Sequence, residues 1–125
     1  MADTQAGAER KRVLIAEDEA LIRLDLAEML VEEGYDVVGE AGDGVEAVEC
    51  AARLKPDLVL LDVQLPDMDG FEIATLLQGN GHRPAIVLTS SRDAAEFGSL
   101  IEQSPARGFV PKAELSGGRL AELLS

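Results

Sequence analysis

The chain has 125 residues, a hydrophobic fraction of 46% and a formal net charge of −13 at pH 7. This length and apolar content fit one globular domain with a single core and exclude a disordered chain. The negative charge excludes direct binding to nucleic acid or to anionic membranes, and it favours a bound cation or a basic protein surface as partner.

The start of the chain carries acidic residues and no apolar core of an export signal, and no apolar stretch reaches the ~18 residues of a membrane span. We therefore expect a cytoplasmic protein without a membrane partner. The single cysteine, Cys50, excludes an intramolecular disulfide. It occupies an apolar position of a predicted helix, where we expect a buried, unreactive thiol.

Residues 1–12 are small, polar and charged, which predicts a flexible arm before a domain that spans residues 13–125. Within the domain, short apolar runs alternate with helical patterns. Strands are predicted over residues 13–16, 37–41, 57–62, 85–89 and 108–110. A helix is predicted after each strand: one that Gly34 ends, then 45–55, 71–78, 93–103 and 115–124. The fourth helix is expected to be weak because Gly98 lies inside it.

Alternating strands and helices with buried strands predict a parallel sheet that has helices on both faces. Right-handed crossovers make a flavodoxin-like fold the natural solution, a doubly wound (βα)5 three-layer sandwich with strand order 2-1-3-4-5. In this order the carboxyl ends of the first and third strands meet at the point where open α/β sheets build ligand sites.

Polar side chains stand at the carboxyl ends of these strands. Glu17 and Asp18 end the first strand, Asp62 ends the third, Thr89 ends the fourth and Lys112 follows the fifth. Three carboxylates ionise together only beside a cation, and hard oxygen ligands suit Mg²⁺ or Mn²⁺. A lysine and a hydroxyl can bind the remaining oxygens of a phosphoryl group, and a carboxylate nucleophile forms an acyl phosphate. This constellation predicts phosphoryl transfer onto Asp62.

The sequence resembles the receiver domain of bacterial two-component response regulators, over about residues 12–124. Four motifs carry this resemblance, each at the end of a predicted strand: Ile15-Ala16-Glu17-Asp18, Leu61-Asp62-Val63-Gln64-Leu65-Pro66-Asp67-Met68-Asp69-Gly70, Val87-Leu88-Thr89-Ser90 and Phe109-Val110-Pro111-Lys112. The resemblance implies a phosphorelay signalling domain with slow self-catalysed chemistry, and not an enzyme in the usual sense.

The resemblance assigns the metal site and the donor. It implies that Asp62 is the phosphoacceptor and that Glu17, Asp18 and the backbone carbonyl of Gln64 bind Mg²⁺ together with it. A sensor histidine kinase or a histidine phosphotransfer protein would donate the phosphoryl group. Glu17 departs from the family pattern, because an aspartate is commoner at this position.

The resemblance also assigns the response. Thr89 and Lys112 would approach the phosphoryl group, and Phe109 would turn inward as a switch. The face built from the fourth helix, fifth strand and fifth helix would then bind a downstream protein, by a monomer or a weak homodimer. Phe109 has no hydroxyl, so its part would be packing alone. Ala113 follows Lys112 where the family often has proline.

Two other functions stay open. The chain can be the receiver part of a longer regulator that has a nucleic-acid-binding output, although a stand-alone receiver is favoured. A haloacid-dehalogenase-type phosphatase would need a second aspartate two residues after Asp62, where Gln64 stands. Asp67 and Asp69 are expected to be turn or cap residues rather than ligands, and His82 a solvated loop residue.

Overall fold

The computed structural model describes residues 10–79 and 81–124. Within them, five parallel strands form one sheet in the order β2-β1-β3-β4-β5, which confirms the predicted order. Most of the predicted arm lies outside the described residues, and β1 begins one residue earlier than predicted. The strands are β1 (Arg12–Ala16), β2 (Asp36–Ala41), β3 (Leu58–Asp62), β4 (Ala85–Ser90) and β5 (Gly108–Pro111).

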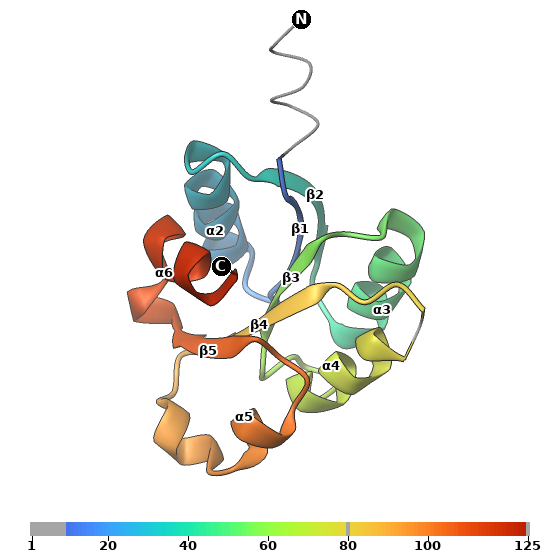
Figure 1. Ribbon diagram of the computed structural model, residues 1–125, viewed down its shortest axis with the longest axis vertical. Helices are drawn as coiled ribbons and strands as arrows, with labels where there is room; N and C mark the ends of the chain where they lie inside the picture. Colours follow the sequence, from blue (N-terminus) through green and yellow to red (C-terminus); the bar gives the residue numbers. More distant parts are fainter. Residues whose placement is uncertain (1–9, 80, 125) are drawn as a thin grey trace, which may run out of the picture.

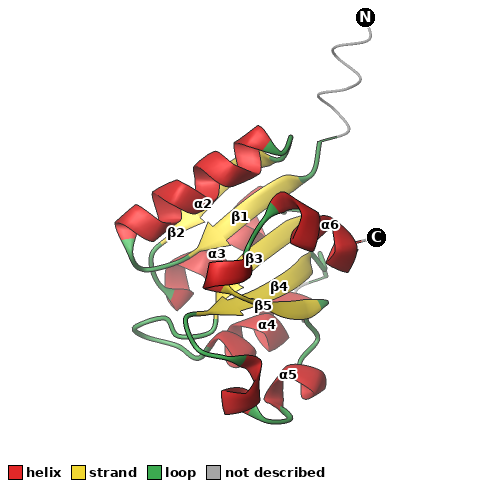
Figure 2. Ribbon diagram, turned by 90° about the vertical axis from the view of Figure 1, so that its left-hand side faces the viewer, coloured by secondary structure: helices red, strands yellow, loops and turns green. Residues whose placement is uncertain are grey.

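Helices cover both faces of the sheet and make three layers (Figure 1; Figure 2). One face carries α2 (Ala20–Glu32) and α6 (Gly117–Leu124), and the other carries α3 (Gly44–Leu54) and α4 (Gly70–Gln78). The strands all run in the same direction, so their carboxyl ends share one edge of the sheet (Figure 2). No helix in the described part of the chain is both long and apolar enough to cross a membrane.

The strands are apolar on both sides because both sides are covered. Successive strand residues point to opposite faces. In β1, Val13 and Ile15 therefore pack toward α2 and α6, whereas Leu14 and Ala16 pack toward α3 and α4. All residues of β3 are buried. Full burial of one Leu, Ile or Val side chain contributes about 1.5–3 kcal/mol, so the two clusters hold the central strands firmly in register.

Gly34 ends α2 as the sequence predicts. Its φ is 94°, a conformation that L side chains rarely adopt. The N–H of Tyr35 donates to the carbonyl of Leu30 at 2.9 Å, and the N–H of Gly34 donates to that of Val31 at 3.0 Å. These two bonds satisfy carbonyls at the end of the helix and turn the chain directly into β2.

The segment between β4 and β5 corrects one prediction. In place of a helix over 93–103, the chain forms a 3-10 turn, η1 (Ala94–Phe97), and a single α-helical turn, α5 (Leu100–Gln103). Gly98, with a φ of 58°, separates them, and neither contains a buried residue. Without burial, helical propensity interrupted by glycine cannot sustain a longer helix. The last helix, α6, also begins later than predicted because the 3-10 turn η2 (Lys112–Glu114) precedes it.

Gly70 provides a test of how α4 is positioned against β3. A methyl group on Gly70 would lie 2.6 Å from Val63 Cα and 2.8 Å from Asp62 O, and these are backbone atoms that cannot rotate away. We expect Gly70→Ala to lower the free energy of unfolding by about 1–3 kcal/mol in urea denaturation.

Gly79→Ala is the matched control. A methyl group there has no contact closer than 3.6 Å, and the residue has right-handed helical angles. Its free energy of unfolding should stay within about 0.5 kcal/mol of that of the unaltered protein, or rise. Equal losses in the two variants would contradict the packing explanation.

Candidate functional site

Three carboxylates meet at the carboxyl ends of β1 and β3. Asp62 is the last residue of β3, and Glu17 and Asp18 follow β1 directly. One oxygen of each lies within 4.8 Å of the others. Glu17 and Asp62 are buried, whereas Asp18 is exposed. The parallel pairing of β1 with β3 therefore brings together the three acids that the sequence singled out.

Lys112 supplies a positive charge to this cluster from the turn after β5. Its Nζ lies 2.7 Å from Glu17 Oε1 and donates a hydrogen bond of 3.0 Å to Asp62 Oδ2. Burial alone would lower the pKa of Lys112, but the two carboxylates outweigh this effect and raise the pKa above its ordinary value. The lysine is therefore a permanent cation at neutral pH.

The carboxylate of Glu17 is incompletely satisfied. Its Oε2 accepts a hydrogen bond of 3.0 Å from the N–H of Glu19. Its Oε1 is close to the charge of Lys112, yet it is buried and accepts no hydrogen bond from any described residue. Burial raises the pKa of Glu17 above its ordinary value, and Lys112 and the Glu19 N–H offset only part of this effect. A further cation would stabilise the ionised form, so the oxygens of Glu17, Asp18 and Asp62 fit a divalent ion such as Mg²⁺.

Gln64 is placed beside Asp62 by the turn that follows β3. Its N–H donates a hydrogen bond of 2.9 Å to Asp62 Oδ1, so both oxygens of Asp62 have a partner. The side chain of Gln64 is exposed, and its oxygen lies 3.5 Å from the hydroxyl of Ser90. The backbone of Gln64 therefore fixes the orientation of the Asp62 carboxylate.

Thr89 lies directly opposite Asp62 on the neighbouring strand β4. Its side chain is buried, and the hydroxyl donates a hydrogen bond of 2.7 Å to the carbonyl of Val110 in β5. In this conformation the hydroxyl is directed to β5 rather than to Asp62. Thr89 therefore lies at the edge of the site, but its hydroxyl is bonded to β5 and not to the acids.

Phe109 belongs to a row of aromatic rings that the sequence did not reveal. The ring centroid of Phe97 in η1 lies 5.6 Å from that of Phe109 in β5 and 5.7 Å from that of Phe71 in α4. These are all three phenylalanines of the chain. The row connects three elements that are distant in sequence, and it holds η1 against the body of the domain.

Asp67 attaches the loop after β3 to another helix. Its carboxylate accepts hydrogen bonds from the N–H groups of Gly44, at 2.6 Å, and Val45, at 3.0 Å, at the start of α3. These bonds, with that from Gly44 the stronger, hold the pKa of Asp67 below its ordinary value. Asp69 accepts from the N–H of Phe71 as the cap of α4. Both aspartates thus accept hydrogen bonds at helix starts, as the predicted cap role implies, but the partner of Asp67 lies in a different element.

Arg23 is a second residue that sequence reasoning missed. Its Nη1 donates a hydrogen bond of 2.6 Å to the carbonyl of Glu17, and its Nε lies 3.2 Å from Glu40 Oε1. The guanidinium therefore ties the loop that carries the acids to β2. Only the fold brings Glu40 near Arg23, so no local sequence pattern could have indicated this contact.

The comparisons with known proteins agree with this geometry. The family model described as "Response regulator receiver domain" matches residues 13–124. The transcriptional regulatory protein PdtaR of Mycobacterium tuberculosis is 48% identical over 122 residues, which cover 90% of this chain and 60% of that protein. A protein-glutamate methylesterase/protein-glutamine glutaminase of Archaeoglobus fulgidus is 40% identical, with 91% of this chain and 32% of that protein covered.

Solved structures are similar over nearly the whole chain. The signal receiver domain of the putative response regulator NarL from Mycobacterium tuberculosis superposes with a TM-score of 0.81 at 28% identity. That match covers 93% of this chain and 94% of the other. The chain thus covers nearly all of that receiver domain but 60% or less of the two curated relatives described above.

The lowered pKa of Asp67 predicts a pH-dependent contribution to stability. A carboxylate whose pKa falls on folding stabilises the protein above its unfolded-state pKa, and this stability is lost as the pH falls through the folded-state pKa. We expect Asp67→Asn to lower the urea midpoint at pH 6–7, and the difference from the unaltered protein to shrink as the pH falls below about 4. Asparagine has one accepting oxygen where Asp67 uses two, so the variant loses the charge and one hydrogen bond, and the part of the difference that changes with pH reports the charge. A difference that stays constant from pH 7 to 3 would contradict this prediction.

Proposed function

The chain belongs to the response regulator receiver family, and on this premise we propose that Asp62 accepts a phosphoryl group from a sensor histidine kinase or a histidine phosphotransfer protein. The observation that carries the proposal is the buried Asp62 carboxylate, which is held by Lys112 and the Gln64 N–H beside two further acids. Receiver domains are signalling domains, so we propose a switch rather than an enzyme with turnover.

The proposed transfer needs a nucleophile and neutralised charge. An oxygen of Asp62 attacks the phosphorus of the phosphohistidine, the P–N bond breaks, and the leaving imidazole keeps the electron pair and takes a proton from solvent. Mg²⁺ bound by Glu17, Asp18, Asp62 and the Gln64 carbonyl would supply positive charge to the phosphoryl oxygens. Lys112 is within reach of Asp62 Oδ2 and contributes a second positive charge to the same group.

The proposed response begins at Thr89. A phosphoryl group on Asp62 adds negative charge and strong acceptors next to the Thr89 hydroxyl, which then exchanges the Val110 carbonyl for a phosphoryl oxygen. Movement of β4 toward the site leaves space for the ring of Phe109. That ring contacts Phe97, so its rotation changes how η1 rests on the domain.

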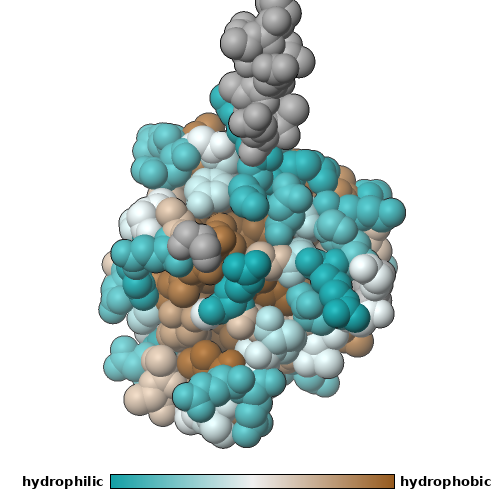
Figure 3. All heavy atoms as spheres, viewed as in Figure 1, coloured by the Kyte–Doolittle hydropathy of each residue, from teal (hydrophilic) through white to brown (hydrophobic). Residues whose placement is uncertain are grey.

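The surface that would report this change is formed by η1, α5, β5 and α6. Hydrophobic residues reach the surface beside α6 and over β5 (Figure 3). In β5 and α6, Phe109 and Leu123 are half-buried. We propose that a downstream protein binds this surface, in the cytoplasm, to a monomer or a weak homodimer of the chain.

A second proposal concerns the whole protein. The relative PdtaR is named a transcriptional regulatory protein and is longer than this chain, which favours a receiver that works as part of a longer regulator with a nucleic-acid-binding output. The charge of −13 makes residues 1–125 an unsuitable surface for nucleic acid, so that contact would be made by a further domain. A phosphatase of the haloacid-dehalogenase type is disfavoured because Gln64 cannot act as a general acid.

Asp62→Asn tests the phosphoacceptor. Incubation with a small acyl phosphate and Mg²⁺ should add one phosphoryl group to the unaltered protein and none to the variant, because an amide oxygen is a poor nucleophile. Intact mass measures the product. Asp69→Asn is the control, since it makes the same change in the same loop but keeps its capping role, and it should be phosphorylated normally. Full labelling of Asp62→Asn would overturn the proposal.

Lys112→Ala separates metal binding from the response. Removal of its charge leaves the carboxylate cluster for the ion, so Mg²⁺ affinity should be kept or rise, as measured by calorimetric titration. Phosphorylation of this variant should no longer shift the amide NMR signals of Phe97 and Phe109, whereas the exposed control Lys11→Ala should show the full shifts. If phosphorylation shifts these signals in Lys112→Ala as much as in the unaltered protein, Lys112 does not couple Asp62 to the response.

A further inference from the structure

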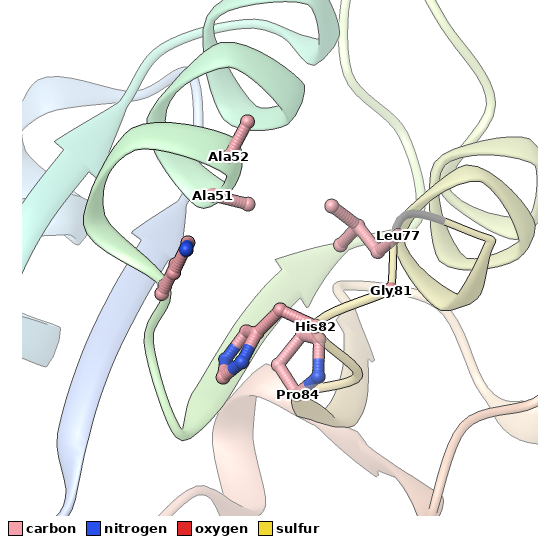
Figure 4. Close-up of a pocket in the computed structure, with 7 residues that line it drawn as sticks. Ala51, Ala52, Leu77, Gly81, His82 and Pro84 are labelled. Carbon is pink, nitrogen blue, oxygen red and sulfur yellow. The ribbon is translucent and has the colours of Figure 1, made fainter.

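A cavity lies at the end of α3 and α4 that is remote from the acids. Its volume is about 490 Å³, within the roughly 300–1,000 Å³ of typical small-molecule sites. Figure 4 shows Ala51 and Ala52 of α3 across the cavity from Leu77 of α4, with His82 and Pro84 beside them. The described residues that line it are Ala51, Ala52, Lys55, Leu77, Gly81, His82 and Pro84.

The charge of this cavity is opposite to that of the molecule. The chain has 24 acidic and 11 basic residues, yet the described residues of the lining include no carboxylate and do include a lysine and the single histidine. Two other surface cavities are lined by acids: one by Asp67, Asp69 and Glu72, the other by Glu28 and Glu32. Small anions are therefore attracted here and repelled from those sites.

Lys55 stands at the end of α3 with a well-defined backbone and an exposed side chain. Lys55 ends α3 in the left-handed conformation, with a φ of 50°, and it is the only described non-glycine residue with positive φ. Its carbonyl accepts a hydrogen bond of 2.9 Å from Arg12 Nη1. Among the described residues, the ammonium group of Lys55 has no ion-pair or hydrogen-bond partner.

His82 is an exposed loop residue, as the sequence predicts, and its ring also has one backbone partner. Its Nε2 lies 2.6 Å from the carbonyl oxygen of Pro56. Because a carbonyl can only accept, Nε2 carries a proton and donates it, and Nδ1 is the ring nitrogen left for another partner. The ring is thus oriented at the cavity by a contact from the loop that precedes β3.

We propose that this cavity binds a small organic anion that has a carboxylate or phosphate head on a short apolar chain. The apolar chain packs on Ala51, Ala52 and Leu77. These side chains form no hydrogen bonds with water, so covering them with an apolar chain is favourable. The head pairs with the free ammonium of Lys55 beside the ring of His82. A polyanion is excluded because the net charge of −13 would repel it. This proposal is independent of phosphorylation at Asp62.

The first test compares three probes of equal chain length on the unaltered protein: hexanoate, hexyl phosphate and hexanamide. Chelator in the buffer keeps divalent ions from the acid cluster. Amide NMR titration should give saturable shifts at Ala51, Ala52 and Leu77 with at least one of the two anions, and comparison of the two identifies the preferred head. Hexanamide should bind at least about tenfold more weakly, because it lacks the charge. Equal binding of hexanamide, or no saturable shift with either anion, would overturn the proposal.

The second test uses a pair of charge-matched variants. Lys55→Gln removes the charge that lines the cavity, and Arg83→Gln removes an exposed charge just outside it. The affinity for the better anion should fall about tenfold in Lys55→Gln and by less than about twofold in Arg83→Gln. An equal fall in both variants would show a general effect of charge and contradict a defined site.

Discussion

The contact of Lys112 with Glu17 and Asp62 is the interaction on which the carboxyl edge of the sheet depends. Two buried carboxylates at neighbouring strand ends repel each other, and the ammonium group of Lys112 offsets this repulsion, whereas the two apolar clusters hold β1 and β3 in register. The lysine directly follows the edge strand β5, so the same contact also ties the end of that short strand to the centre of the sheet. The contacts of Lys112 therefore both compensate the buried charge and position the end of β5. A metal ion bound by the acids would add further positive charge to this arrangement.

Around this contact, the loops are held by bonds between elements. Asp67 joins the loop after β3 to the start of α3, and Arg23 joins the loop after β1 to β2. Gly70 allows α4 to begin in direct contact with the backbone of Asp62. The acids are thus presented by loops that have little freedom, which lowers the entropy lost when the site binds a ligand. On the other side of the site, η1 has no buried residue and is held to β5 and α4 by the row of phenylalanines.

The sequence predicted the sheet order and the gathering of Glu17, Asp18, Asp62 and Lys112, because apolar runs and parallel topology determine where strand ends meet. It failed where a single contact between distant segments decides the outcome. The helix expected over 93–103 depended on periodicity alone, and no buried residue supports it. The contacts of Arg23 with Glu40, of Asp67 with Gly44 and of His82 with Pro56 span 17 to 26 positions. No local pattern encodes such distances, so the structure was needed to find them.

The lack of buried residues in η1 and α5 has a thermodynamic consequence. An opening of this segment exposes little apolar surface, so it carries only a small change in heat capacity. The free energy of such an opening varies nearly linearly with temperature, without the strong curvature of global unfolding. The enthalpy of a conformational equilibrium confined to this segment would therefore stay nearly constant with temperature, whereas the enthalpy of global unfolding changes steeply.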